Sequence, residues 1–306
     1  MKMVSWMNFE EELKKKTVHM EEVLEAFLPK EEGLQKTVIE AMNYSAMAGG
    51  KRLRPLLMEE TYKMFGGSGE LIEPFMAAIE MIHNYSLVHD DLPAMDNDEY
   101  RRGKKTTHVV YGEGMAVLAG DGLLNFAFET ACLAFERAKT YEEYKKAASA
   151  LTVLAKKAGI YGMIGGQCAD IEAEDMQTDL TEELILFIHE HKTAALIQSA
   201  MMIGAILAGA DMEQVAAIEK CAYNIGIAFQ IQDDILDVTS SMEILGKPIG
   251  SDEKNNKITY VTIHGLEQSK EKTASLSNEA NSILASFPTR NLFLEELVEQ
   301  LIYRQK

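Results

Sequence analysis

The chain has 306 residues, of which 47% are hydrophobic, and it carries a formal net charge of −18 at pH 7. That length and apolar content allow one large hydrophobic core or two ordinary ones. The negative charge disfavours nucleic-acid partners, which require a basic face on the protein, and it disfavours electrostatic docking on anionic membranes.

The predicted elements are almost entirely helical. Apolar residues recur at spacings of three and four and few segments alternate, which indicates an all-α protein. We expect helices at residues 9–28, 33–48, 52–65, 71–92, 113–138, 141–158, 160–173, 181–209, 211–239, 252–264, 267–286 and 290–304. The expected N-caps are Thr140, Thr181, Asp211 and Ser251. Because no tandem repeat or linker interrupts the pattern, residues 1–306 are predicted to form one domain, an antiparallel helix bundle around a central cavity.

Neither a secretory signal nor a membrane span is predicted. Residues 10–12 are all glutamate and follow the few apolar residues at the N-terminus, which is unlike a secretory signal. The longest apolar run, residues 194–210, contains Gln198 and Ser199 and is shorter than the ~20 residues of a membrane span. We therefore expect a buried core helix there, and no stable membrane insertion.

The chain has three cysteines, Cys132, Cys168 and Cys221. They are far apart, odd in number and without metal-ligand spacing. We interpret them as small buried apolar residues of a protein in a reducing cytosol.

The first motif with a chemical implication is a glycine pair followed by cations. Gly49 and Gly50 precede Lys51, Arg52 and Arg54 at the predicted start of a helix. Backbone N–H groups at a helix start favour anions, and lysine and arginine add positive charge. A solvated basic turn explains such a motif equally well when it stands alone. In so acidic a chain, three cations beside two glycines favour an anion site.

An acid cluster follows the helix predicted around residues 71–92. That helix has apolar residues at helical spacing, at Phe75, Ala78, Ile79, Ile82, Leu87 and Val88. The cluster contains Asp90, Asp91, Asp96, Asp98 and Glu99, and Arg101 and Arg102 follow at once. Burying carboxylates at a helix end costs folding free energy unless a cation balances their charge, and hard oxygen ligands suit Mg²⁺. Taken alone, the cluster is equally consistent with a solvated acidic face.

A second acid cluster, residues 230–237, favours the metal interpretation. Its flanking residues are apolar, which predicts a largely buried helix. Asp233 and Asp237 are four residues apart and Asp234 and Asp237 three, so the carboxylates lie along one side of that helix. Two such clusters predict a cavity that holds several divalent ions. Because Mg²⁺ prefers one or two carboxylates plus phosphate oxygens and water, the expected ligand is a phosphate or diphosphate.

The chain resembles the trans-isoprenyl diphosphate synthases, and most closely the bacterial farnesyl diphosphate synthases. The resemblance covers nearly the whole chain through motifs in one order: GGKRLRP, HDDLPAMDND-RRG, LAGD, GGQ-AD, HKT, FQIQDDILDV and GKPIGSD-NNKITY. It implies an all-α isoprenoid synthase fold with a deep cavity between two aspartate-rich helices. It also implies a cytoplasmic homodimer with about three Mg²⁺ ions per active site.

The resemblance implies roles for individual residues. Mg²⁺ ions are assigned to Asp90, Asp96 and Asp233, with support from Asp91, Asp234 and Asp237. Contacts to the allylic diphosphate are assigned to Arg101, Lys192, Lys247 and Lys257. The pocket for isopentenyl diphosphate is assigned to Gly50, Lys51, Arg54, His83 and Arg102. Polar residues near the reacting carbons are Gln167, Thr193 and Gln230.

The implied reaction joins isopentenyl diphosphate to dimethylallyl or geranyl diphosphate, giving (2E,6E)-farnesyl diphosphate by ionisation, condensation and elimination. Tyr85, five residues before Asp90, is expected with Ser86 to form a floor that stops growth at fifteen carbons. The alternatives are a geranylgeranyl diphosphate synthase, and a Tyr85 that is an ordinary core aromatic. Glu99-Tyr100 stands where relatives often carry Asp-Leu, and this change is not expected to affect metal binding.

Three other functions explain parts of the pattern. A terpene cyclase shares the fold and one acid motif, but it has no use for a second, homoallylic diphosphate, so the basic loop and His83 disfavour it. A non-catalytic subunit of a heteromeric prenyltransferase typically lacks one aspartate motif, and both are intact here. A plain acidic scaffold does not explain carboxylates on apolar helices.

Overall fold

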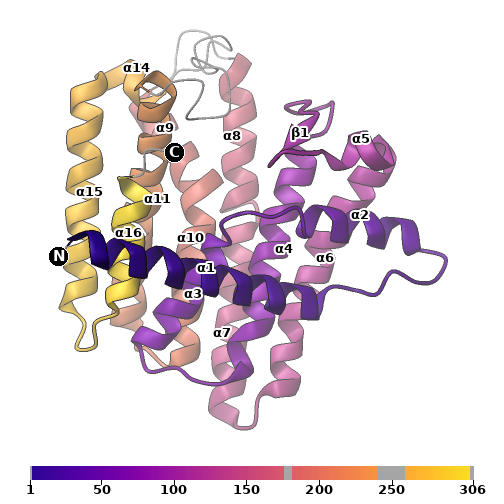
Figure 1. The fold of residues 1–306 in the computed structure, drawn as a ribbon, viewed down its shortest axis with the longest axis horizontal. Helices are drawn as coiled ribbons and strands as arrows, with labels where there is room; N and C mark the ends of the chain where they lie inside the picture. The colour runs from indigo at the N-terminus through magenta and orange to yellow at the C-terminus, as the bar shows by residue number, and fades with distance from the viewer. Residues whose placement is uncertain (1, 176–180, 240–258, 304–306) are drawn as a thin grey trace. The chain divides into compact units, whose positions relative to one another are not determined.

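The computed structural model describes residues 2–175, 181–239 and 259–303. Within these ranges the chain is helical apart from one two-stranded ribbon (Figure 1), so the predicted all-α fold class is confirmed. The chain divides into two compact units, Met1–Glu59 with Ser68–Leu151, and Glu60–Gly67 with Thr152–Lys306. The single domain expected for residues 1–306 stays a prediction.

In the first unit, one buried helix carries the core. Helix α4 (Glu73–Asp90) packs most extensively against α6 (Glu113–Arg137), and it also contacts α1 (Lys2–Phe27) and α2 (Lys36–Ala46) (Figure 1). Helix α4 has Pro74 in its first turn, where a missing N–H costs no intrahelical hydrogen bond. Its fully buried residues include Phe75, Ala78, Ile79 and Ile82, as their spacing predicts.

The first unit also contains η1 (Glu70–Ile72), the antiparallel strands β1 (Tyr100–Arg101) and β2 (Lys104–Lys105), and α5 (Thr107–Tyr111). Two helices, α3 (Leu53–Met64) and α7 (Tyr141–Ala158), each have residues in both units.

The second unit is organised around α11 (Met212–Thr239). This helix packs against α15 (Leu266–Ser286), α10 (Ala195–Ala208) and the π-helical turn η2 (His189–Ala194). Helix α10 is buried over nearly its whole length, which confirms the core helix expected in residues 194–210. The remaining helices are α8 (Met163–Asp175), α9 (Glu182–Ile188), α14 (Tyr260–His264) and α16 (Leu292–Ile302).

The helix starts follow the predicted caps. Thr140, Thr181 and Asp211 each accept a hydrogen bond from the backbone N–H three residues further on, at 3.2, 3.3 and 2.8 Å. Ser251 lies outside the described residues. The sequence pattern missed the β1–β2 ribbon and α5, because elements of two and five residues are too short to show a period. It also missed the π-helical turn inside the helix expected at 181–209.

The interpretation of the cysteines was right for one of the three. Cys221 is buried, and burial raises the pKa of its thiol to about 12. Cys132 and Cys168 are exposed, so the prediction that they are buried was wrong. Cys132 directly follows the buried Ala131 on α6, and one residue turns a helix by about 100°, which is enough to carry a side chain from core to solvent.

Helix α6 is the one described helix that is long and apolar enough to cross a membrane, and 39% of the qualifying window is buried. Length and composition alone do not separate a membrane span from a core helix of a globular protein. Because α6 packs along α4, we treat it as part of the core of the first unit.

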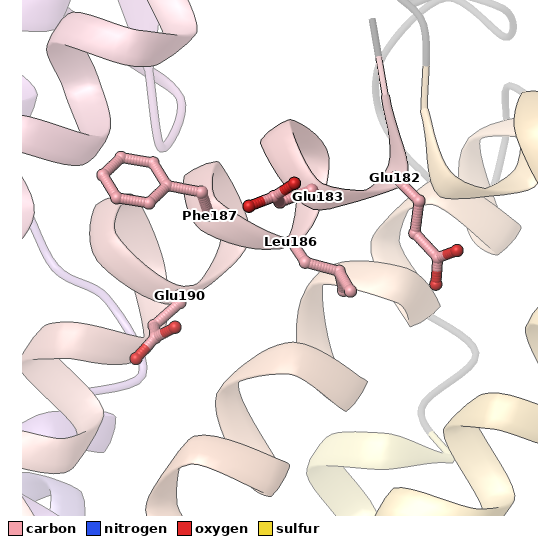
Figure 2. Close-up of a pocket in the computed structure, with 5 residues that line it drawn as sticks. All are labelled: Glu182, Glu183, Leu186, Phe187 and Glu190. Carbon is pink, nitrogen blue, oxygen red and sulfur yellow. The ribbon is translucent and has the colours of Figure 1, made fainter.

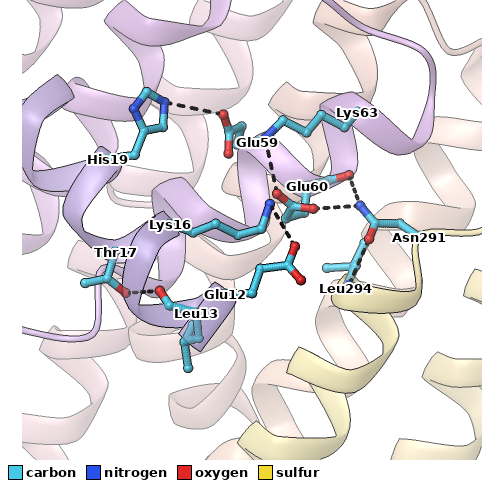
Figure 3. A network of polar contacts seen from close by, with 10 residues as sticks. All are labelled: Glu12, Leu13, Lys16, Thr17, His19, Glu59, Glu60, Lys63, Asn291 and Leu294. Atoms are coloured by element: carbon cyan, nitrogen blue, oxygen red, sulfur yellow. Dashed lines mark hydrogen bonds and ion pairs between the residues drawn. The ribbon is translucent and has the colours of Figure 1, made fainter. Parts of the chain in front are cut away.

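Buried carboxylates on α3 have structural partners within their own units. In the first unit, Glu59 lies 3.6 Å from His19 of α1 (Figure 3). In the second unit, Asn291 donates a hydrogen bond of 2.8 Å to Glu60, and its own side-chain oxygen accepts one from the N–H of Leu294 at the start of α16 (Figure 3). These contacts explain two buried acids without a catalytic role.

The close approach of α11 to η2 depends on Gly226, and we expect Gly226→Ala to lower the free energy of unfolding by about 1–3 kcal/mol. A Cβ at this position would overlap the backbone and side chain of Ala194. Gly114→Ala is the matched control, since that helical glycine on α6 has open space around it. Thermal or urea unfolding of both variants measures the difference. Equal stability of the two variants would contradict the close-packing account.

Candidate active site

The first acid cluster is a loop folded back onto the end of α4. Asp90 is the last residue of α4, and the backbone N–H of Asp96 donates a hydrogen bond of 2.9 Å to the carbonyl of Asp90. The N–H of Asn97 donates to the carbonyl of Leu92 at 3.1 Å, and Asn97 has a left-handed φ of 54°. The loop therefore returns Asp96, which is exposed, to the half-buried Asp90.

Asp91, which directly follows Asp90 in the sequence, is hydrogen-bonded to an arginine. Asp91 is 4% exposed, and Arg101 Nε donates to its Oδ1 at 2.6 Å. Arg101 also lies 3.4 Å from Asp98. Burial by itself would lower the pKa of Arg101, but the hydrogen bond and charge of Asp91 outweigh it and raise that pKa. Asp91 thus fixes Arg101 beside the acid loop, which is a supporting role.

The basic loop before α3 lies against Arg102. Gly49 and Gly50 have φ values of 94° and 133°, and Arg102 donates a hydrogen bond to the carbonyl of Gly49. The φ of Gly50 lies in a region that residues with a Cβ rarely adopt, so glycine is favoured at this position. Lys51 is exposed and Arg54 half-buried. The structure thereby brings the predicted cations of residues 49–54 together with Arg102.

His83 belongs to the same cluster of charges. Burial lowers its pKa well below the usual value, and the nearby charges of Arg54, Arg102, Arg101 and Arg52 lower it further. Burial also lowers the pKa of Arg54 to about 10, although the arginine stays charged at neutral pH. A neutral imidazole surrounded by arginines is suited to hydrogen-bonding an anion that the arginines attract.

In the second unit, the three aspartates of the second cluster differ in environment. Asp234 is buried, accepts a hydrogen bond from the N–H of Tyr260 at 3.0 Å and lies 3.8 Å from His189. Asp233 is exposed and Asp237 is half-buried. The spacing predicts all three carboxylates along one side of α11. In the structure Asp234 is buried and bonds to α14, whereas Asp233 is exposed, so the three carboxylates differ in their surroundings. This supporting contact is one that periodicity alone does not reveal.

Lys192 lies on the π-helical turn η2 and is held by α8. Its Nζ donates to Asp170 Oδ2 at 2.5 Å, and Asp170 is 5% exposed. Gly166 of α8 touches the backbone of Lys192 so closely that any Cβ there would overlap it. Irregular turns of this kind are frequent at functional sites. Gln167, Thr193 and Gln230 are half-buried in the same unit.

The carboxylates present fit Mg²⁺ in its usual mode of binding. Within residues 2–175, 181–239 and 259–303, no group of three or more histidine, cysteine or carboxylate side chains is arranged to hold a metal ion by itself. Mg²⁺ seldom uses an all-protein cage and takes most of its ligands from phosphate and water. Asp90 and Asp96, joined by a backbone hydrogen bond, supply the hard oxygens that such an ion needs.

Two predicted residues, Lys247 and Lys257, lie outside the described residues. Three residues were missed as contributors to the sites, namely Glu80, Asp170 and His189, and Arg52 was predicted as an anion-site cation without its buried partner. Asp170 stood in the quoted GGQ-AD motif, and its spacing from Lys192 gave no reason to pair them. Arg52 and Glu80 are 28 residues apart, so their contact depends on tertiary packing.

An open hollow of about 450 Å³ on α9 is not a candidate for a diphosphate site. It is lined by Glu182, Glu183, Leu186, Phe187 and Glu190 (Figure 2). Three carboxylates and no cation among these lining residues disfavour an anionic ligand.

The sequence model of the family described as "Polyprenyl synthetase" matches residues 35–286. The chain belongs to this family. A farnesyl diphosphate synthase of Geobacillus stearothermophilus is 45% identical over 256 residues, 83% of this chain and 84% of that protein. A chloroplastic geranylgeranyl pyrophosphate synthase of Catharanthus roseus is 44% identical over 266 residues, 87% of this chain and 73% of that protein.

The fold is also that of solved synthases. The crystal structure of geranylgeranyl pyrophosphate synthetase from Pyrococcus horikoshii superposes with a TM-score of 0.87 at 31% identity, covering 98% of this chain and 99% of that one. The expected isoprenoid synthase fold is therefore confirmed, and the chain is a prenyltransferase of the polyprenyl synthetase family.

Proposed function

We propose that the protein condenses isopentenyl diphosphate with dimethylallyl or geranyl diphosphate to give (2E,6E)-farnesyl diphosphate. The observation that carries the proposal is the cluster in the first unit, where Arg54, Arg102 and a neutral His83 lie together. Arg101, the neighbour of Arg102, is bonded to the acid loop. The first unit thus has a cluster of cations suited to one diphosphate next to a carboxylate loop suited to a second, metal-bound one.

In the proposed mechanism, the C–O bond of the allylic diphosphate breaks to give a delocalised carbocation. Asp90 and Asp96 would hold Mg²⁺ together with the diphosphate, and the ion would supply positive charge that stabilises the leaving group. Arg101 donates hydrogen bonds to the same diphosphate as its charge grows. The sequence motifs alone propose Asp233 as a ligand of a further Mg²⁺, with Asp234 and Asp237 in support, and Lys192 as a contact to the allylic diphosphate.

The basic loop and His83 then hold the isopentenyl diphosphate while its double bond attacks the carbocation. The departing diphosphate is the proposed base for the final proton. Because water would trap the carbocation, the reacting carbons need an apolar surrounding.

The fifteen-carbon product is part of this proposal, and a geranylgeranyl diphosphate synthase is the alternative. Relatives bear both names at nearly equal identity, 45% and 44%. Incubating the protein with Mg²⁺, isopentenyl diphosphate and dimethylallyl diphosphate, then sizing the dephosphorylated products, tests the proposal. Farnesol as the main alcohol supports it, geranylgeraniol supports the alternative, and no condensed product contradicts both.

A cytoplasmic homodimer remains part of the proposal. Helix α6 supports the dimer, because it presents several apolar side chains to solvent within the first unit, namely Val117, Leu118 and Leu133, exposed to 42%, 54% and 36%. Apolar side chains that are exposed in a single copy suit contact with a second copy of the chain.

For the isopentenyl diphosphate pocket, we expect Lys51→Ala and Arg54→Met each to raise the KM for isopentenyl diphosphate about tenfold or more. Each substitution removes charge-assisted hydrogen bonds, which are worth about 1.5–3 kcal/mol. The KM for the allylic substrate should change much less. Steady-state kinetics with each substrate varied in turn measure both constants. Lys36→Ala, at an exposed lysine paired with Glu40, is the control. A parallel rise of both constants would show that the loop is not a dedicated pocket.

A further inference from the structure

Arg52 differs from the other cations of the basic loop. It is 2% exposed, whereas its neighbour Lys51 is exposed to solvent. Its φ of 48° lies in the left-handed region, which an arginine rarely adopts and which persists only when surrounding contacts impose it. The contacts of the Arg52 side chain provide this constraint.

The Arg52 side chain joins the basic loop to two helices. Its Nη2 donates a hydrogen bond of 2.8 Å to the carbonyl of Ala46, the last residue of α2. Its Nη1 donates one of 2.9 Å to Glu80 Oε1 in the middle of α4. Glu21 of α1 lies 3.7 Å away. These contacts fix a left-handed turn directly between Lys51 and Arg54.

Glu80 is the buried partner of this charge. It is 2% exposed and lies one helical turn before His83 on α4. Burial lowers the pKa of Arg54 and of Arg102, and the charge of Glu80 is the largest effect opposing that burial at both arginines. A single buried carboxylate thus serves three arginines of the proposed pocket, one by a hydrogen bond and two by its field.

We propose that Glu80 is a positioning residue for the isopentenyl diphosphate pocket, holding Arg52 so that the loop presents Lys51 and Arg54 in binding geometry. The identity of the ligand rests on the proposed function, whereas the positioning of the loop does not. Arg52 itself, paired and buried, is a structural member of the loop and leaves binding to its neighbours.

Electrostatics alone leads to the opposite expectation. Removing a negative charge from beneath three arginines should strengthen the attraction for a diphosphate. Positioning demands that the same change weaken binding, because Arg52 loses its close buried counter-charge, so that its side chain and the turn are held less firmly. The direction of the change in affinity therefore decides between the two accounts.

The test is Glu80→Gln, which removes the charge and keeps the shape. We expect the KM for isopentenyl diphosphate to rise about tenfold and the KM for geranyl diphosphate to change less than about twofold. Glu73→Gln is the matched control, because Glu73 lies seven residues earlier on α4 and pairs with Arg137 at 2.7 Å. It should leave both constants unchanged. An unchanged or lower KM for isopentenyl diphosphate in the folded Glu80→Gln variant overturns the proposal, and so does an equal rise of both constants.

Hydrogen exchange supplies a readout that does not depend on catalysis. Amides of residues 49–54 should exchange faster in Glu80→Gln than in the wild type or in Glu73→Gln, and unchanged exchange overturns the proposal. If the wild type shows no prenyl transfer, the proposed function fails. Hydrogen exchange of residues 49–54 in the wild type and in Glu80→Gln, with and without inorganic diphosphate, still tests whether Glu80 positions the loop. Should Glu80→Gln not fold, Glu80→Asp, which withdraws the carboxylate by one methylene group, is measured in the same way.

Discussion

Asp90→Asn is expected to lower kcat by at least about 100-fold while leaving the protein folded. The substitution removes an anionic oxygen ligand and keeps the shape of the side chain. Charge on the departing diphosphate develops only in the transition state, so a lost metal ligand should affect turnover far more than substrate binding. Asp233→Asn should behave alike if both acid clusters serve the reaction.

The measurement is single-turnover and steady-state kinetics over a range of Mg²⁺ concentrations. Partial recovery at high Mg²⁺ is expected for a weakened metal ligand, and unfolding temperature serves as the check on folding. Glu129→Gln is the control, since Glu129 is an exposed acid of the same unit. If either aspartate variant keeps wild-type turnover, that cluster does not bind a catalytic metal ion.

Local pattern predicted the helices and the places of the motifs well. The burial of residues such as Ile79 follows from spacing, because one face of each helix must be covered, and α4 ends at Asp90, close to the predicted end at residue 92. The caps at Thr181 and Asp211 follow from side-chain chemistry at a helix start. These features depend on neighbours within a few residues of one another.

Partners of the site residues could not be predicted in this way. The pairs Asp91–Arg101, Lys192–Asp170 and Asp234–Tyr260 depend on packing between separate segments. The sequence shows that a charged residue is present, but it does not show which residue it pairs with. From the sequence, each acid cluster looks like a uniform set of ligands, whereas in the structure Asp91 and Asp234 are buried and Asp96 and Asp233 are exposed.

Tyr85→Ala is expected to shift the main product from fifteen carbons to twenty or more while keeping the rate of the first condensation. Tyr85 is five residues before Asp90 on α4, which places it about 7.5 Å along the helix axis. If the prenyl chain is anchored by its diphosphate near Asp90 and extends along α4, it is expected to meet this ring as it grows. Tyr85 is 6% exposed, so the ring is held among other side chains.

The neighbours of Tyr85 make it a firm obstacle. Its ring lies edge-on to that of His89, with centroids 5.8 Å apart. His89 is in turn confined by Gly120 of α6, where any Cβ would overlap the imidazole, and its Nε2 lies 3.1 Å from the carbonyl of Val117. Burial, with a smaller contribution from the charge of Asp90, raises the pKa of Tyr85 to about 12, so the phenol stays neutral at working pH.

Tyr85→Phe separates the ring from its hydroxyl. If the ring is the floor, Tyr85→Phe makes the same product as the wild type, and only Tyr85→Ala makes longer ones. Sizing of dephosphorylated products by chromatography gives the answer, with the initial rate on dimethylallyl diphosphate as the check that Tyr85→Ala still folds. Unchanged product length in Tyr85→Ala would make Tyr85 an ordinary core aromatic. A twenty-carbon wild-type product would instead show that Tyr85 does not set the limit on chain growth.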